Sequence, residues 1–144
     1  MRVLAFRKRL NTNIIEEGGA DMPQTMQSLI KRYVSEIHKI YGSHVKQIIL
    51  YGSYARGDYT ADSDVDIMIL LDISDIAIKD YRHQLSDMTY DFNLDHDMDI
   101  KPIVKNEEHF LKWIDNYPFY ANIQKEGVSL YGAALRYWNE NWFI

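Results

Sequence analysis

Apolar residues recur at steps of three and four between residues 26 and 40, which is typical of one buried face of a helix. Asp21 followed by Pro23 predicts the beginning of this helix, and Gly42 predicts its end, because proline suits a first helical turn and glycine the position after the last one. The apolar positions are Met26, Leu29, Ile30, Tyr33, Val34, Ile37 and Ile40.

Two further segments have an apolar pattern typical of strands. Residues 47–51 form a short apolar run that ends at Gly52, which predicts a buried strand followed by a sharp turn. Residues 97–104 predict another strand, in which Pro102 indicates an edge position or a strand that is nearly finished, because proline has no N–H to donate.

Residues 64–72 alternate acidic and apolar side chains, which is the pattern of a strand with two different faces. Because successive side chains of a strand point to opposite faces, Asp64 and Asp66 are expected on one face and Val65 on the other. Both carboxylates should therefore point the same way.

Helices are expected after each of these strands. A short helix should follow Gly52, and one continuous helix is predicted from the spacing of Ile78, Tyr81, Leu85, Met88 and Phe92. Asn106 predicts the beginning of the next helix, and Pro118 and Gly127 bound a further short one. The expected order is helix, strand, short helix, strand, helix, strand, helix.

The composition fits one compact domain, because 144 residues with 47% hydrophobic content can supply a continuous core. The absence of cysteine excludes disulfides, thiolate zinc sites and cysteine nucleophiles, and it fits a cytoplasmic location. A formal net charge of −5 argues against a broad cationic surface for nucleic acid, and no apolar run approaches the roughly 20 residues that span a bilayer. We therefore expect no membrane insertion and no extended nucleic-acid binding.

The two ends of the chain differ from the patterned region, so we divide the chain into an arm (1–21), a domain (22–132) and a tail (133–144). The arm contains the basic residues Arg7, Lys8 and Arg9 and is expected to be loosely attached. The tail is rich in aromatic residues that either fold back onto the core or bind a partner, including a second copy of the chain. They are Tyr137, Trp138, Trp142 and Phe143.

The turn after the first strand has the features of a triphosphate cradle. A strand that leads into Gly52, Ser53 and a short helix presents unpaired backbone N–H groups and a hydroxyl to an anion. Glycine lets the backbone turn tightly and approach phosphate oxygens, and Ser53 can donate its hydroxyl to one of them. Arg56 lies one turn further on, where it either adds positive charge to the cradle or is an ordinary surface residue of the helix.

Two carboxylates on one face of a rigid strand repel each other strongly unless a cation lies between them. Mg²⁺ is the expected cation for Asp64 and Asp66, because it prefers oxygen ligands and commonly binds one or two carboxylates together with substrate phosphates. A third carboxylate is expected from a neighbouring strand. We choose Asp99, which lies between apolar residues as mid-strand residues do, and Asp97 on the same expected face is the alternative.

These residues carry a family resemblance. A Gly-Ser pair, a ten-residue gap (54–63) and an Asp-x-Asp pair resemble the DNA polymerase β-type nucleotidyltransferase superfamily, and in particular its minimal nucleotidyltransferase (MNT) branch. In that branch Gly-Ser-x-Ala-Arg-Gly and Ser-Asp-x-Asp-Ile recur, and here they read as residues 52–57 and 63–67. Each pair alone is common in unrelated proteins, whereas the combination in a strand, turn, helix and strand context is specific. The similarity extends more loosely from about Met22 to Gly132.

The resemblance implies a fold, an activity and a partner. The fold is α/β (α+β), with a small mixed β-sheet flanked by helices. The activity is transfer of AMP from ATP to a hydroxyl acceptor with two Mg²⁺ ions, which Asp64, Asp66 and Asp99 would bind. Members of this branch often serve as antitoxins beside a HEPN-type RNase toxin, and some adenylylate a tyrosine of that toxin, so a HEPN-type toxin is the expected partner.

Two other functions compete with protein adenylylation. The chain could be a catalytically idle antitoxin that neutralises its toxin by binding alone. It could also transfer AMP to a small molecule such as an aminoglycoside, because the same metals would serve that reaction. Polymerase and RNA-tailing activities rank lower, because one small domain offers little surface for a long nucleic acid.

Overall fold

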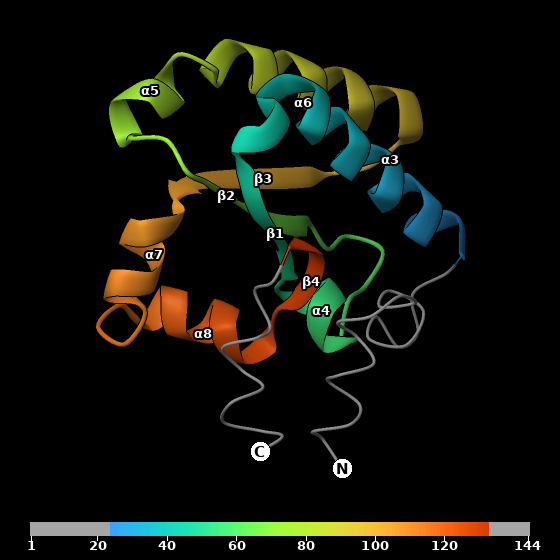
Figure 1. Cartoon of the computed structure of the whole chain (residues 1–144). Coiled ribbons are helices and arrows are strands. Elements are labelled where there is room, and N and C mark those ends of the chain that lie inside the picture. Colours follow the sequence, from blue (N-terminus) through green and yellow to red (C-terminus); the bar gives the residue numbers. More distant parts are fainter. Residues whose placement is uncertain (1–23, 133–144) are drawn as a thin grey trace.

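A computed structural model of the chain describes residues 24–132, which form helices packed on both faces of one sheet (Figure 1). The arm and the tail lie outside the described residues. The elements, in order, are α3 (Gln24–Tyr41), η1 (Gly42–His44), β1 (Val45–Tyr51), α4 (Ser53–Arg56), β2 (Val65–Leu71), α5 (Asp75–Lys79), α6 (Arg82–His96), β3 (Ile100–Asn106), α7 (Glu107–Trp113), α8 (Pro118–Glu126) and β4 (Val128–Gly132).

The four strands form one mixed sheet in the order β3-β2-β1-β4. β1 pairs antiparallel with β2 and with β4, whereas β2 pairs parallel with β3. β3 is an edge strand, as Pro102 predicted. The α/β class with a mixed sheet is therefore confirmed.

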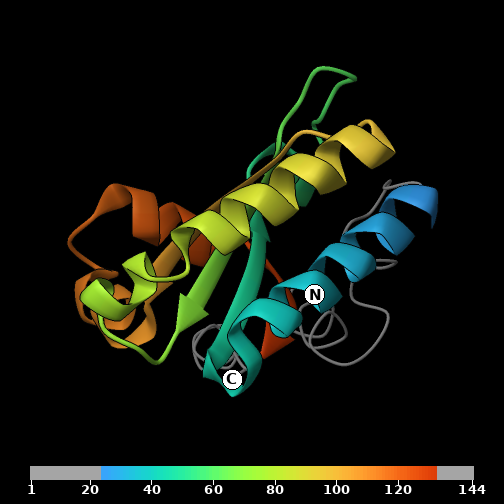
Figure 2. The same cartoon turned by 90° about the horizontal axis from the view of Figure 1, so that it is seen from above.

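Alternation along the strands divides the apolar residues between two cores. One face packs against α3 and α6, which lie side by side in Figure 2, and its core includes Ile48, Val65, Ile67 and Ile69. The other face packs against α7 and α8 through a smaller core that includes Met68 and Leu70 of β2. The expected separation of acidic and apolar faces is thus present only where β2 begins, because from Met68 onward both faces are apolar.

Several predicted boundaries are confirmed by local chemistry. The first helix ends at Gly42, which has a positive φ of 58°. Asn106 caps α7 by accepting a hydrogen bond from the backbone N–H of His109 at 2.9 Å. Pro118 begins α8, and Gly127 follows its last residue.

Two expectations from the sequence were wrong, and one strand was not predicted. The single helix expected over residues 78–92 is divided into α5 and α6, because Asp80 and Tyr81 make i→i+3 backbone hydrogen bonds between them. Asp97 does not share a strand face with Asp99, because it follows α6 in the left-handed region (φ 52°) and β3 begins at Ile100, so Asp99 also lies before the strand rather than in its middle. β4 was not predicted, because its five residues at the sheet edge are too few to show a clear alternation.

Within residues 24–132, no helix has the length and apolar character needed to cross a bilayer.

Candidate active site

The turn that follows β1 depends on Gly52. Its φ of 77° and ψ of −157° belong to a region that side chains strongly disfavour. A Cβ atom built on Gly52 would also lie 3.2 Å from Cγ of Asp66 and closer still to its Oδ2 atom. The backbone of the proposed phosphate-binding turn and the Asp66 carboxylate are therefore in direct contact.

Hydrogen bonds hold the short helix α4 behind this turn. The Gly52 carbonyl accepts from the N–H groups of Ala55 and Arg56, each at 3.0 Å. The carbonyl of Ser53 accepts from the N–H of Gly57 at 2.9 Å, and Gly57 has a φ of 88°. Glycine at both ends thus lets a helix of four residues begin and stop within the loop between β1 and β2.

Three carboxylates meet at one end of the parallel pair β2 and β3. Val65 opposes Ile100, and the N–H of Val65 donates to the Asp99 carbonyl at 2.9 Å, so Asp64 and Asp99 lie side by side just before their strands. A hydrogen bond between these two carboxyl groups lowers the pKa of Asp64 and raises that of Asp99. The structure therefore brings Asp64 and Asp99 together, while Asp66 lies two residues along the same strand face.

Asp66 is the least solvated of the three acids. Burial raises its pKa above the usual value of 3.8, and the nearby Asp64 carboxylate raises it further. Tyr51, which opposes Asp66 in the β1–β2 register, has a pKa raised to about 12 by burial and by Asp66. A charged Asp66 is therefore unfavourable unless a cation approaches it.

Lys101 is a residue of this cluster that the sequence analysis missed. Its Nζ atom lies 3.4 Å from Oδ2 of Asp64 and 3.9 Å from Oδ2 of Asp99. It also opposes Asp66 in the β2–β3 register. The signal was in the sequence, because a residue two positions after Asp99 in a strand must share its face.

Arg56 lies near the acids but is paired elsewhere. Its guanidinium contacts Asp58 at 3.2 Å and Glu126 of α8 at 3.1 Å, and its charge lowers the pKa of Asp66. Arg56 therefore links α4 to α8 and contributes positive potential at the cluster. Its contact with a phosphate stays a prediction.

A polar cavity of about 320 Å³ borders Asp99. Tyr54 and Ser63 line it, and the ring of Tyr54 is stacked on Tyr59 at 4.2 Å. Asp97 also lines this cavity from the end of α6. Of the two alternatives for the third acid, Asp99 is the one that contacts Asp64.

The cluster is suited to a hard divalent cation, although its side chains are not arranged around one. Among residues 24–132, no group of three or more His, Cys, Asp or Glu side chains has a geometry that could hold a metal ion. The ammonium group of Lys101 lies beside the carboxylates of Asp64 and Asp99 and partly neutralises their charge. The donors are all carboxylate oxygens on or beside rigid strands, which are the ligands that Mg²⁺ prefers. The residues are therefore of the chemical type that fits such an ion, and binding it would require the carboxylates to rearrange as well as Lys101 to move away.

The chain matches known proteins over this region. A family model described as "Nucleotidyltransferase domain" matches residues 28–130. "Putative protein adenylyltransferase MJ0604" of Methanocaldococcus jannaschii is 39% identical over 105 residues, covering 73% of this chain and 97% of that protein. "Putative protein adenylyltransferase MJ0141" of the same organism is 30% identical over 92 residues, covering 62% and 91%. A crystal structure of a toxin-antitoxin with AMP-PNP is similar over 77% of this chain and 78% of that one, at 17% identity and a TM-score of 0.47.

Proposed function

We propose that this chain, which belongs to the nucleotidyltransferase domain family, transfers AMP from ATP to a hydroxyl group of a partner protein. The observation that carries the proposal is the contact between the Gly52 turn and Asp66, beside the paired acids Asp64 and Asp99. A phosphate-binding turn and a carboxylate cluster in contact are what the transfer of a nucleotide requires. The relative MJ0604 is named a putative protein adenylyltransferase, and this chain covers 97% of it, which favours a protein acceptor.

Each residue has a role in this proposal. The backbone of Gly52 and the hydroxyl of Ser53 bind triphosphate oxygens, and Arg56 adds positive charge beside them. Asp64, Asp66 and Asp99 would hold two Mg²⁺ ions, which when bound supply neutralisation of the triphosphate charge. In the transfer, the acceptor oxygen bonds to the α-phosphorus while the bond to pyrophosphate breaks.

Asp99 is the residue that takes up the acceptor proton. It borders the polar cavity, from which an acceptor hydroxyl can approach. Lys101 must first release Asp64 and Asp99, so its ion pairs stabilise the acids before substrate binds.

The finer proposal is that the acceptor is a HEPN-type toxin, as the MNT resemblance of residues 52–67 implies. The purified chain would be incubated with Mg²⁺, α-labelled ATP and the product of the neighbouring gene. We expect label on that protein with the wild-type chain and with Asp91→Asn, an exposed control on α6. We expect none with Asp64→Asn at unchanged folding. Failure of the wild-type chain to label any acceptor would contradict the proposal.

The same variant separates catalysis from binding. If Asp64→Asn still neutralises the toxin in cells, the idle-antitoxin alternative is correct. If the wild-type chain labels an aminoglycoside but no protein, the small-molecule alternative is correct. Parallel reactions with labelled CTP, GTP and UTP would test the choice of ATP.

A further inference from the structure

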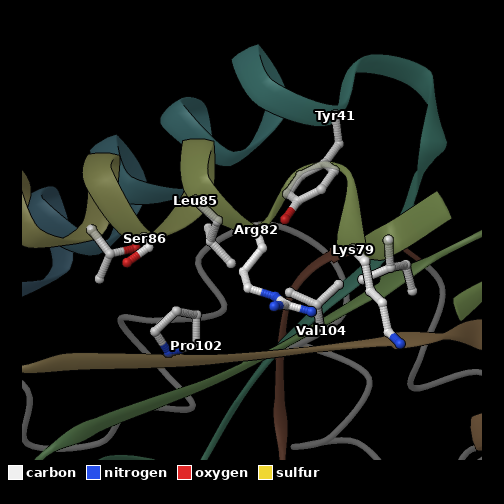
Figure 3. A pocket seen from close by; sticks show the side chains of 9 residues that line it. Tyr41, Lys79, Arg82, Leu85, Ser86, Pro102 and Val104 are labelled. Atoms are coloured by element: carbon white, nitrogen blue, oxygen red, sulfur yellow. The ribbon is translucent and has the colours of Figure 1, made fainter. Parts of the chain in front are cut away.

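A second cavity lies on the opposite face of the sheet from the carboxylates. It has a volume of about 410 Å³ and lies between α5, α6 and the edge strand β3 (Figure 3). Pro102 and Val104 of β3 line it, whereas Lys101, between Asp99 and Pro102 in the chain, turns to the acidic face. The cavity is therefore separate from the candidate active site and within the size range of small-molecule pockets.

The floor of this cavity is apolar. The side chain of Leu85 and the ring of Tyr41 line it and are 8% and 3% exposed. Together with Pro102 and Val104, they form a surface on which a flat or compact apolar group can pack. Burial of such a group stabilises a complex by about 25 cal/mol per Å² of apolar surface before the costs of binding are subtracted.

Two cationic side chains lie over this apolar floor. Lys79 and Arg82 both line the cavity, and Figure 3 shows the Arg82 side chain reaching from α6 toward β3. Within residues 24–132, neither Lys79 nor Arg82 forms an ion pair with a carboxylate. The hydroxyl of Ser86, about one helical turn beyond Arg82 on α6, also lines the cavity. These groups offer N–H and O–H donors to an anion. None of the residues that line the cavity is acidic, so no carboxylate there would repel the anion.

The free edge of β3 is closed to an added strand. Asn93 of α6 donates to the Ile100 carbonyl at 3.1 Å and accepts from the Ile100 N–H at 2.9 Å. Because strand residues alternate in direction, Pro102 faces the same outer edge and has no N–H to donate. A backbone segment of a partner would therefore find few hydrogen bonds here, and side-chain contacts must hold the ligand.

We propose that this cavity binds a small organic anion, a carboxylate or a phosphate monoester with a compact apolar body. The anionic group contacts Arg82 and Lys79, and the body packs on Leu85, Pro102 and Val104. The inference goes beyond the transferase activity, because none of these residues belongs to the carboxylate cluster. A bound ligand would touch β3, whose first residue directly follows Asp99.

The test uses the full chain and three probes that differ in the anionic group. Binding of 2-naphthoate, 1-naphthyl phosphate and neutral 2-naphthamide would be followed by calorimetry and by amide chemical shifts in the NMR spectrum. We expect saturable 1:1 binding of at least one anion and about tenfold weaker binding of the amide, the scale of one lost charge-assisted hydrogen bond. Comparison of the two anions distinguishes a carboxylate ligand from a phosphate ligand.

Three variants locate the bound probe. Arg82→Gln should weaken binding about tenfold, whereas Arg32→Gln, an exposed arginine of α3 outside this cavity, should leave it unchanged. Ser86→Trp should abolish binding by filling the cavity, and shifts in wild-type spectra should centre on Leu85 and Val104. Asp64→Asn should bind the probes normally, so that a failed transferase proposal leaves this one intact. Absence of saturable binding would overturn the proposal for this cavity. Binding of the probes by Arg82→Gln and Ser86→Trp with wild-type affinity would overturn it as well.

Discussion

The two faces of the sheet are made by the same strands but have opposite properties. On the α3–α6 face, Val65, Ile67 and Ile69 are at most 2% exposed and belong to one continuous core. On the other face, Asp64 lies just before β2 and Asp66 near its start, and the face becomes apolar only at Met68, where α7 and α8 pack. The difference follows from the period of two in a strand, which lets alternate residues serve stability and chemistry separately.

This separation explains how the acids are held in place. A cluster of like charges is unfavourable, so it needs a rigid support that does not itself depend on those charges. Buried side chains of β2 provide that support one residue away from Asp64 and Asp66, and Ile100 of β3 does so for Asp99. Substitutions on the two faces should therefore have separable effects on activity and on stability.

Asp66→Asn should have the largest effect, and on activity alone. Removing a carboxylate that the reaction needs should lower the rate of transfer about thousandfold, the scale of losing one strong electrostatic contact in the transition state. The free energy of unfolding should be unchanged or slightly higher, because burial and Asp64 already disfavour the charged form of Asp66. Labelling kinetics and urea unfolding would measure both quantities, with Asp87→Asn on α6 as the control. Full activity of the variant would remove Asp66 from the site.

Ile67→Ala should have the opposite profile. Ile67 is 0% exposed, and truncation of such a residue costs about 2–5 kcal/mol of unfolding free energy. At a temperature where the variant is still folded, its labelling rate should fall less than tenfold, because the acidic face keeps its groups. A thousandfold loss of activity in a fully folded variant would show that the two faces are not separable.

Much of this division could be predicted from the sequence, because it depends on local patterns. The alternation of Asp64 to Asp72 gave the two faces of β2, and the Gly-Ser turn gave the position of α4. The resemblance to the nucleotidyltransferase superfamily is confirmed by the family model over residues 28–130. The roles of Gly52, Ser53, Arg56 and the three acids stay predictions.

The missing parts depend on contacts between distant segments. The contact of Gly52 with Asp66 and the pairing of Arg56 with Glu126 cross between elements, so no local pattern contains them. β4 forms because β1 supplies a partner strand, and its own five residues carry a weak signal. We predicted Asp97 to lie in a strand, whereas it follows α6 in the left-handed conformation. That conformation depends on where β3 starts, which no local pattern contains.

Gly52→Ala should affect both stability and activity, because Gly52 joins the turn to the acidic face. An alanine at φ 77° is strained, and its Cβ atom would meet the Asp66 carboxylate. The free energy of unfolding should therefore fall by about 1–3 kcal/mol, and transfer should be severely reduced. Gly57→Ala is the matched control: its φ is 88°, but no heavy atom lies within 4 Å of the added Cβ. It should lose about 1 kcal/mol and keep its activity. Equal activity loss in both variants would attribute the effect to strain alone.

Lys101→Met should have the smallest effect, and it tests whether the lysine occupies the place of a cation. Without the ammonium group, Asp64 and Asp99 are free for a metal ion, so the half-saturating Mg²⁺ concentration in calorimetric titration should fall about fivefold, the equivalent of one exposed ion pair. In EDTA the variant should unfold at a lower temperature than the wild type, because the acids then repel each other without a counter-ion. Lys105→Met, two positions beyond Ile103 on the same strand, should change neither quantity. An unchanged Mg²⁺ titration together with an unchanged unfolding temperature would show that Lys101 is an ordinary surface residue, and the acidic face would then be balanced by solvent alone.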